Sequence, residues 1–476
     1  MMHQPIILNN VSLHLAQRVC FENLNAQIHY GKRIGIIGRN GSGKSSLLKI
    51  IQKLMEPSHG QVITPPNIIF GYVPQILDTF EKLSGGQRFN EALTQALALN
   101  HNVLCLDEPT NNLDLSNRKS LLRMLAHCQK TLIIVSHDVE LLRTNIDEIW
   151  HINEEKVFIF PGNYDAYQAT QEAAWNTRLK QLEQLKKEKR KTRQALQFEQ
   201  KRAAQSKHAN KYENDKKLKG AMKQWGSKTR GKKSGHINAL HHQIEQELKQ
   251  SRLPEIIEPK FHLRNTDLTS SKALVSIANG SCGYNNNTVL EKINLQIGPC
   301  ERIALVGDNG SGKSTLIKAL LDDAHIHKTG IWLTPKKEEI GYLDQQYKTL
   351  DPMRSVFDTI KLVAPHWKTP EIRQHLNDFL FRKNEEVNAL TSTLSGGEKA
   401  RLSLAHIAAQ NKRLLMLDEI TNNLDLETKD HVIQVLNAYP GTIIVISHDE
   451  YFLKQINIAT CYSIAQGRCT FMKTTP

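Results

Sequence analysis

The chain has 476 residues, which is enough for two or three domains that each bury a core, and its formal net charge of +14 suggests an acidic partner. It contains no run of 18 or more apolar residues, and the opening MMHQPIILNN lacks the basic-then-apolar pattern of a secretory signal. Its seven cysteines are scattered and form no CxxC pair, so we expect reduced thiols in a cytoplasmic protein, without disulfides or a zinc site.

The segment RIGIIGRNGSGKSSLLKII (33–51) predicts a β-strand, a glycine turn and a helix, and RIALVGDNGSGKSTLIKAL (302–320) repeats it. In G-x-x-x-x-G-K-S the glycines let backbone N–H groups curl around phosphates, the lysine reaches the β- and γ-phosphates, and the serine hydroxyl ligates Mg²⁺. Two such loops make chance negligible, so we predict two ATP sites. The expected nucleotide contacts are Gly38, Asn40, Gly41, Ser42, Gly43, Lys44, Ser45, Ser46, Gly307, Asn309, Gly310, Ser311, Gly312, Lys313, Ser314 and Thr315.

Two further strands end in paired acids, in VLCLDEPTNNLD (103–114) and LLMLDEITNNLD (414–425). Asp107 and Asp418 suit Mg²⁺ coordination, whereas Glu108 and Glu419 suit polarisation of the attacking water. Carboxylates that merely cap buried strands are the alternative, which the phosphate loops disfavour.

A histidine follows a strand in TLIIVSHD (131–138) and again in TIIVISHD (442–449). His137 and His448 therefore lie at the strand ends that face the ligand in an open α/β sheet. A single histidine there is more often structural, but its recurrence favours contact with the γ-phosphate.

The motifs KLSGGQR (82–88) and TLSGGEKAR (393–401) complete a pattern that resembles the ATP-binding cassette superfamily in both halves. The resemblance implies two α/β P-loop cassettes with parallel sheets, paired head to tail, so that each Ser-Gly-Gly motif closes over ATP on the opposite phosphate loop. This would place Ser395, Gly396 and Gly397 across from Lys44, and Ser84, Gly85 and Gly86 across from Lys313.

The same resemblance assigns further site residues. Gln75 and Gln345 occupy the family's glutamine loop, Tyr284 suits adenine stacking, and Leu15 stands at the matching place of the first half. Ile420 replaces the family's usual proline. The implied Mg²⁺ ligands are Ser45, Gln75 and Asp107 in the first half and Ser314, Gln345 and Asp418 in the second.

Motif spacing differs between the halves. Lys44 and Lys313 are 269 residues apart and Gln75 and Gln345 are 270 apart, whereas His137 and His448 are 311 apart. The first half therefore lacks 41 residues (311 − 270) between its glutamine and signature loops, where only 76–82 remain, too few for a helical hairpin. In membrane transporters this helical region docks the transmembrane partner, so its loss argues against a symmetric transporter motor.

The excess positive charge lies between the two halves. The segment 178–252 holds 22 Lys and Arg against 7 Asp and Glu, a net of +15, so the rest of the chain sums to −1. Composition predicts a helix from Trp175 to about Asp215, and coiled-coil spacing predicts a second one that ends before Pro254. We expect an antiparallel hairpin with a basic, glycine-rich tip suited to structured RNA. Its expected RNA or tRNA contacts are Lys223, Trp225, Lys228, Arg230, Lys232 and Lys233. A solvated linker is the alternative.

With FPGNYDAY (160–167) and SHDEYFL (447–453), the resemblance narrows to the ABC-F proteins, soluble double cassettes that act on the ribosome. It implies an ATP hydrolase that uses Mg²⁺, is monomeric with intramolecular cassette pairing, and points its hairpin toward the P-site tRNA and peptidyl-transferase centre. The expected domains are 1–162, 163–270 and 271–476. A shortened first cassette is found in members that protect ribosomes from antibiotics. A general translation factor, a transporter motor and a DNA-maintenance protein are the alternatives.

Overall fold

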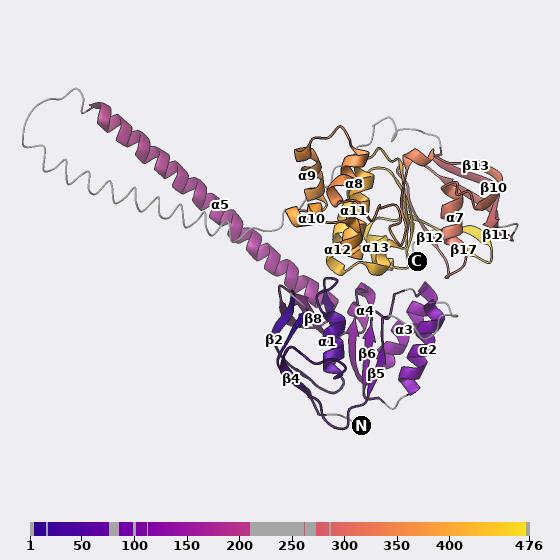
Figure 1. The fold of residues 1–476 in the computed structure, drawn as a ribbon, viewed down its shortest axis with the longest axis horizontal. Helices are drawn as coiled ribbons and strands as arrows, with labels where there is room; N and C mark the ends of the chain where they lie inside the picture. Colours follow the sequence, from indigo (N-terminus) through magenta and orange to yellow (C-terminus); the bar gives the residue numbers. More distant parts are fainter. Residues whose placement is uncertain are drawn as a thin grey trace, which may run out of the picture. The chain divides into compact units, whose positions relative to one another are not determined.

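The computed structural model describes residues 4–15, 18–75, 85–98, 101–111, 113–209, 261, 273–284 and 287–472 (Figure 1). The chain separates into two compact units. One unit combines Met1–Asp165 with Ile257–Pro476 and so holds both P-loop halves, while Ala166–Ile256 forms the other. Each unit is described by itself below.

The core of the first cassette is a six-stranded sheet with the order β5-β6-β7-β3-β8-β9, in which β9 alone runs antiparallel to its neighbour. Its middle strands are continuous apolar runs, as expected for strands that are covered on both faces. The strands are β3 (Arg33–Gly38), β5 (Phe70–Val73), β6 (Val103–Asp107), β7 (Thr131–Val135), β8 (Glu148–Asn153) and β9 (Lys156–Pro161).

The second cassette repeats this topology as β14-β15-β16-β12-β17-β18, with β18 antiparallel. The fold therefore confirms the expected pair of α/β cassettes with parallel sheets. The strands are β12 (Arg302–Val306), β14 (Ile340–Leu343), β15 (Leu414–Asp418), β16 (Thr442–Ile446), β17 (Thr460–Ala465) and β18 (Arg468–Met472).

Each cassette also has a three-stranded antiparallel sheet, ordered β2-β1-β4 in the first and β11-β10-β13 in the second. Buried and more exposed residues mix along these strands, and Ile6, Phe21 and Ile28 are fully buried. The strands are β1 (Ile6–Leu15), β2 (Arg18–Ile28), β4 (His59–Ile63), β10 (Val275–Tyr284), β11 (Asn287–Ile297) and β13 (Ile326–Leu333).

Helices pack on these sheets and begin where the sequence offers a cap. Asp114 accepts a hydrogen bond from the N–H of Asn117 at the start of α3, and Asp425 does so from Thr428 at the start of α12. The helices of the first cassette are α1 (Lys44–Ile51), α2 (Gly85–Ala98), α3 (Leu115–His127) and α4 (Val139–Thr144). Those of the second are α7 (Lys313–Leu320), α8 (Val356–Val363), α9 (Thr369–Asp378), α10 (Asn384–Asn388), α11 (Gly396–Ala408), α12 (Leu426–Ala438) and α13 (Glu450–Gln455), with short 3-10 turns η3 (Lys337–Glu339), η4 (Thr391–Thr393) and η5 (Ile420–Asn423).

In the second cassette, α8, α9 and α10 lie between β14 and α11. They bury an apolar face that includes Ile360, Leu376 and Phe379 in the same cluster as residues of α11. The corresponding stretch of the first cassette, 76–84, lies outside the described residues. The 41-residue difference in spacing thus corresponds to a helical subdomain that the second cassette has.

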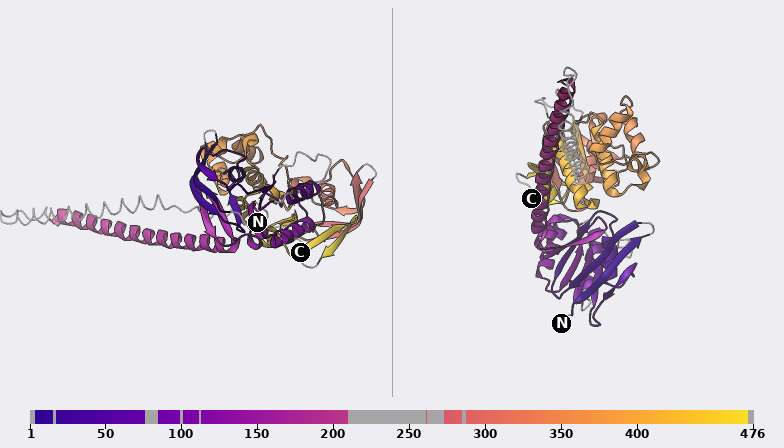
Figure 2. Two further views of the ribbon diagram at one scale, coloured as in Figure 1. Left: turned by 90° about the horizontal axis from the view of Figure 1, so that it is seen from below. Right: turned by 90° about the vertical axis from the view of Figure 1, so that its left-hand side faces the viewer.

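Helix α5 (Tyr164–Ala209) begins the basic segment and is drawn as one continuous helix in Figures 1 and 2. It starts at Tyr164 rather than Trp175, because the side chain of Tyr164 is buried and Asp165 in the first turn pairs with Arg143 at 2.7 Å. The rest of the expected hairpin, from residue 210 to Pro254 and including the six tip residues, lies outside the described residues. None of the helices that the structure describes is both long and apolar enough to cross a membrane.

Candidate active sites

Both phosphate loops leave the sheet at the carboxyl end of a central strand, after β3 and after β12, where the order of the strands reverses. Gly38 and Gly307 have φ values of 150° and 154°. A Cβ at Gly38 would stand 2.6 Å from the carbonyl oxygen of Ile152, and one at Gly307 would stand 2.2 Å from that of Ile464. Only glycine therefore allows the loop to pass this close to the neighbouring strand.

The loop lysines are buried and lie over their own loops. Lys44 donates hydrogen bonds to the carbonyl oxygens of Gly38 (2.9 Å) and Arg39 (3.0 Å), and Lys313 donates to Gly307 at 2.7 Å and to Asp308 at 2.9 Å. Burial lowers the pKa of both ammonium groups. This places a positive charge in the turn where the phosphates of a nucleotide would lie.

Buried hydroxyl groups in the same loops are available to a ligand. The Oγ atoms of Ser42 and Ser311 are buried and have no hydrogen-bond partner among the described residues. A buried hydroxyl without a partner is costly, so each favours a phosphate oxygen beside it. Ser46 and Thr315 follow in the first turns of α1 and α7.

The two elements that would hold a divalent cation are in direct contact. Ser45 Oγ lies 3.1 Å from Asp107 Oδ1, and Ser314 Oγ lies 3.3 Å from Asp418 Oδ1. Burial raises the pKa of both carboxyls, while the serine hydrogen bonds oppose that shift. Paired oxygen ligands of this type fit Mg²⁺, which takes a few protein oxygens and completes its shell with water and phosphate. Gln75 and Gln345 are exposed just after β5 and β14, the strands beside β6 and β15.

In the first site Glu108 and His137 are in direct contact. The N–H of His137 donates to Glu108 Oε2 (3.3 Å), and His137 Nε2 stands 3.3 Å from Glu108 Oε1. Burial raises the pKa of Glu108 to about 8, despite the opposing charge of Lys44. Burial also holds the pKa of His137 well below its ordinary value, with Lys44 and Lys429 adding to the effect. The imidazole is therefore neutral at pH 7.

The second site has the same groups in a looser arrangement. His448 Nε2 stands 3.8 Å from Glu419 Oε1, and the Asn422 side chain donates to Glu419 Oε2 at 3.1 Å. The Glu419 side chain is 20% exposed, compared with 6% for Glu108. Burial and the charge of Lys313 lower the pKa of His448 to about 4. Ile420, at the family's proline position, packs its side chain into the core.

The second signature motif opens a helix toward the first phosphate loop. Helix α11 begins at Gly396, and Ser395 caps it by accepting from the N–H of Glu398. Burial lowers the pKa of Arg401 in this helix, and the charge of Arg39 in the first phosphate loop contributes to the shift. This charge interaction links helix α11 to the first phosphate loop, whereas the pairing of Ser395 with Lys44 stays a prediction. Gly397 lies within α11, Gly85 and Gly86 open α2, and Ser84 lies outside the described residues.

Each phosphate loop is also held by an aspartate of the opposite cassette. The N–H of Asn40 donates to Asp425 Oδ2 at 2.9 Å. Burial opposes ionisation of Asp114, but backbone donors that include the N–H of Asn309 lower its pKa. Asp114 and Asp425 are not among the predicted site residues, although the repeated NNLD before α3 and α12 is a signal for them.

The two loops differ in one cross-cassette ion pair. Arg39 forms a bidentate ion pair with Glu427 of α12. Asp308 and Ser116 occupy the corresponding positions of the other site, so the second site has no counterpart of this pair. Spacing alone could not have identified the contact, because its partners are 388 residues apart.

The two residues predicted to lie at the adenine occupy matching strand ends, and their role stays a prediction. Leu15 and Tyr284 are the last residues of β1 and β10, and each is paired with the first residue of the next strand. In the first site that partner is Arg18, whose Nη1 would stand 3.5 Å from a Cβ at Gly41 of the phosphate loop. A planar guanidinium can stack on a base, so Arg18 is a candidate contact that was not among the predicted site residues.

The six expected RNA contacts lie outside the described residues.

A family model described as ABC transporter matches residues 21–75 and 290–422, which are parts of both cassettes. Among curated proteins, the ribosome protection protein VmlR of Bacillus subtilis is 27% identical over an alignment of 482 positions that covers 95% of this chain and 86% of VmlR. The probable ATP-binding protein YheS of Haemophilus influenzae is 29% identical over an alignment of 528 positions that covers 94% of this chain and 77% of YheS.

Among solved structures, the RNase-L inhibitor matches with a TM-score of 0.64 at 17% identity. The match covers 98% of this chain and 90% of the RNase-L inhibitor chain. The complex of an archaeal ribosomal stalk protein with an archaeal ribosome recycling factor also has a TM-score of 0.64 at 17% identity, over 97% of this chain and 89% of that one. At this identity the likeness shows the fold, which is that of tandem ATP-binding cassettes.

Proposed function

This chain resembles the ABC-F family of tandem-cassette ATPases, as its similarity to VmlR and YheS over both cassettes confirms, and on that premise we propose that it is a ribosome-binding ATPase. It binds ATP in both phosphate loops and hydrolyses it to ADP and phosphate. The observation that carries the proposal is the repeated arrangement of buried lysine, serine–aspartate pair, glutamate and histidine at the carboxyl edge of each sheet.

The proposed chemistry assigns a role to each of these groups. Lys44 and Lys313 hold the β- and γ-phosphates, and the serine–aspartate pairs hold Mg²⁺, which would neutralise charge that develops on the phosphoryl group. Glu108 and Glu419 orient the attacking water and take up its proton. The neutral imidazoles of His137 and His448 are positioned to donate one hydrogen bond to the γ-phosphate.

Cassette pairing is proposed to be intramolecular. The bonds of Asn40 to Asp425 and of Asn309 to Asp114 join the cassettes of one chain at both phosphate loops. ATP that fills a loop and meets the opposite Ser-Gly-Gly motif would draw the cassettes together, and hydrolysis would release them. This supports a monomer as the working unit.

The ribosome is the proposed partner, in the cytoplasm. VmlR is named a ribosome protection protein, and residues 178–252, between the cassettes, carry a net charge of +15. A basic helical segment suits RNA, whose phosphates attract it without sequence preference. We assign the cassettes to 1–162 and 271–476 and the RNA-directed segment to 163–270, with its tip near the P-site tRNA. Similarity to VmlR favours ribosome protection as the role, and we propose an antibiotic as the agent from which the ribosome is protected.

The hydrolysis claim is tested by Glu108→Gln combined with Glu419→Gln. The amide keeps the shape of the carboxyl but cannot accept the proton from water, so turnover should be lost while ATP binding is kept. Phosphate release and binding of a fluorescent ATP analogue measure the two properties. Lys44→Ala with Lys313→Ala is the matched control, because it should lose binding as well. Unimpaired turnover in the glutamine variant would show that these acids are not the catalytic groups.

A further inference from the structure

Two buried cations occupy matching positions in the cassettes. Arg118 of α3 and Lys429 of α12 are 311 residues apart, the same offset as the switch histidines, and are 5% and 3% exposed. Each is paired with the aspartate that follows the histidine of its own cassette. Arg118 Nε and Nη2 donate to the two oxygens of Asp138 at 2.7 Å, and Lys429 Nζ donates to Asp449 Oδ2 at 2.7 Å.

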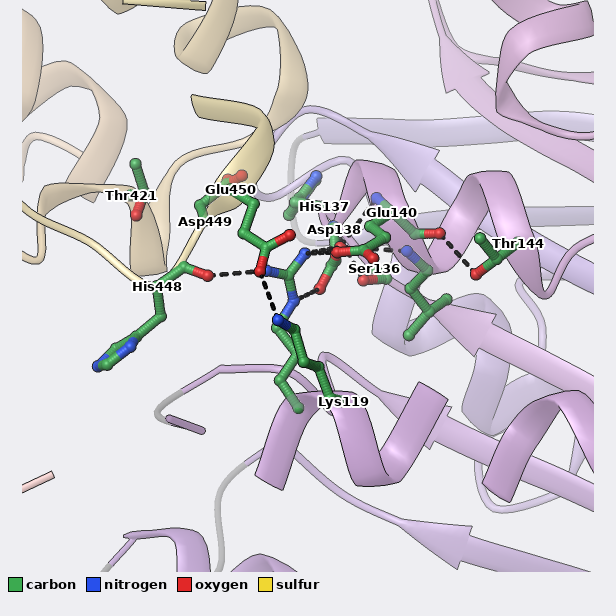
Figure 3. A network of polar contacts seen from close by, with 12 residues as sticks. Lys119, Ser136, His137, Asp138, Glu140, Thr144, Thr421, His448, Asp449 and Glu450 are labelled. Atoms are coloured by element: carbon green, nitrogen blue, oxygen red, sulfur yellow. Dashed lines mark hydrogen bonds and ion pairs between the residues drawn. The ribbon is translucent and has the colours of Figure 1, made fainter. Parts of the chain in front are cut away.

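Each cation also reaches the opposite cassette. Arg118 Nη1 donates to the backbone carbonyl oxygen of His448 at 2.7 Å, and Lys429 Nζ donates to that of His137 at 3.0 Å. Figure 3 shows the first of these networks, with His448, Asp449 and Glu450 approaching Asp138 and Lys119 from the other half of the chain. Lys119 adds an ion pair with Glu450 at 2.9 Å.

The same cations act on the opposite imidazoles through space. Burial and Lys313 lower the pKa of His448, Asp114 opposes them, and the charge of Arg118 adds a further lowering. Burial and Lys44 lower the pKa of His137, and the charge of Lys429 adds to that effect. Burial alone would disfavour the charge of Arg118, but Asp138 outweighs it and raises the pKa of the guanidinium. The Arg118 guanidinium therefore stays charged, and its charge-assisted hydrogen bonds in a buried setting hold its partners firmly.

We propose that Arg118 and Lys429 are positioning residues that act in trans, each fixing the switch histidine at the ATP site of the opposite cassette. The proposal rests on the proposed function, since it concerns the same two sites. Holding the carbonyl of His448 sets the backbone from which its imidazole extends toward Glu419 and the γ-phosphate. Lys429 does the same for His137 and Glu108.

The arrangement couples the two sites. The pairing with Asp138 ties Arg118 to the switch loop of the first site, and the bond to His448 ties it to that of the second. A shift of α3 when the first site changes its nucleotide would therefore move the histidine of the second site. A misplacement of about 1 Å can lower a rate about a hundredfold, so this contact is strong enough to coordinate turnover.

A purely structural role would give a different result. If the cations only fill the interface, their loss should affect both sites equally, or mainly the site whose aspartate loses its partner. The test therefore uses the full-length chain in two backgrounds, Glu108→Gln, in which the second site turns over, and Glu419→Gln, in which the first does. Arg118→Met is combined with Asp138→Asn so that the buried Asp138 carboxylate is not left unpaired, whereas Glu140, which also pairs with Arg118 at 3.2 Å, is 34% exposed. Asp138→Asn alone is the matched control.

We expect the Arg118→Met/Asp138→Asn pair to lower kcat by about tenfold or more in the Glu108→Gln background, relative to Asp138→Asn, with KM within about twofold. In the Glu419→Gln background the kcat of this pair should equal that of Asp138→Asn alone. Lys429→Met with Asp449→Asn should lower kcat in the Glu419→Gln background and leave it unchanged in the Glu108→Gln background, relative to Asp449→Asn alone. This second pair tests the same proposal if the first variant does not fold. Arg118→Lys should restore turnover, because lysine already makes both bonds at the other site.

A readout without turnover separates this inference from the proposed function. In the nucleotide-free protein, NMR titration should show that loss of Arg118 raises the pKa of His448 and leaves that of His137 unchanged, and that loss of Lys429 does the opposite. Absence of hydrolysis in both parent backgrounds would overturn the proposed function alone. Equal losses at both sites, a loss confined to the cassette that carries the substitution, or histidine titrations that do not follow the trans pattern would overturn the positioning role.

Discussion

Asp425 uses its two carboxylate oxygens for different partners: Oδ1 accepts from the N–H of Thr428 and caps α12, and Oδ2 accepts from the N–H of Asn40 in the opposite phosphate loop. One side chain thus joins the start of a helix in the second cassette to the nucleotide loop of the first. The two roles can be separated, because an asparagine has one acceptor oxygen in place of two.

Asp425→Asn should keep the helix cap and lose the loop contact. The side-chain NH₂ of the new asparagine would then face the backbone N–H of Asn40, and two donors cannot form a hydrogen bond with each other. ATP affinity and turnover at the first site should therefore fall. Asp425→Ala should lose both roles and about 1 kcal/mol of unfolding free energy in addition. Urea unfolding and ATPase assays in the Glu419→Gln background measure the two effects. Equal stability of the alanine and asparagine variants would contradict the assignment of the cap.

The raised pKa of Glu108 predicts a pH dependence for the first site. A general base works in its ionised form, so in the Glu419→Gln background turnover should rise with pH until about 8 and fall by about tenfold for each pH unit below that. The double glutamine variant provides the background rate at each pH. A profile that is already flat at pH 6 would show that Glu108 ionises well below its value in the nucleotide-free structure.

The ion pair between Arg39 and Glu427 predicts a small, salt-sensitive difference between the sites. Both side chains are largely exposed, at 67% and 59%, so the contact should contribute about 0–1 kcal/mol and be screened by salt. Arg39→Glu should weaken ATP binding at the first site at low ionic strength, and the exchange Arg39→Glu with Glu427→Arg should restore it. Failure of the exchange to restore binding would exclude a simple charge interaction.

The adenine end predicts unequal base selectivity. Tyr284 can stack on a base, which contributes roughly 1–3 kcal/mol at aromatic side chains, whereas Leu15 cannot. The second site should therefore prefer ATP over GTP more strongly than the first, and Tyr284→Leu should remove the difference. Nucleotide binding with Lys44→Ala or Lys313→Ala isolates each site. Arg18→Ala tests whether a guanidinium replaces the missing ring, since it should then lower selectivity at the first site.

The sequence was sufficient to predict how each cassette folds by itself. Apolar strands followed by glycine turns, paired acids and histidines predicted the sheets and the placement of Lys44, Asp107 and His137 at one edge, because these contacts follow from local order in a parallel sheet. The sequence did not predict that Asn40 meets Asp425 or that Arg118 reaches His448. Those pairs are 385 and 330 residues apart and depend on how the cassettes dock. The start of α5 at Tyr164 was missed for a similar reason, since tertiary contacts of its first turn extend the helix.

The most direct measurement is co-sedimentation of the Glu108→Gln/Glu419→Gln protein with ribosomes across a salt series, in ATP and in ADP. We expect ATP-dependent binding whose logarithm falls linearly with the logarithm of salt, by about 0.7–0.9 per phosphate engaged. Neutralising Lys228, Arg230, Lys232 and Lys233 should flatten that slope. In a chain that keeps Glu108 and Glu419, the same four substitutions should leave ATPase activity without ribosomes unchanged. Binding that is absent, or that is equal in ATP and ADP and insensitive to the four substitutions, would contradict a ribosome-directed ATPase.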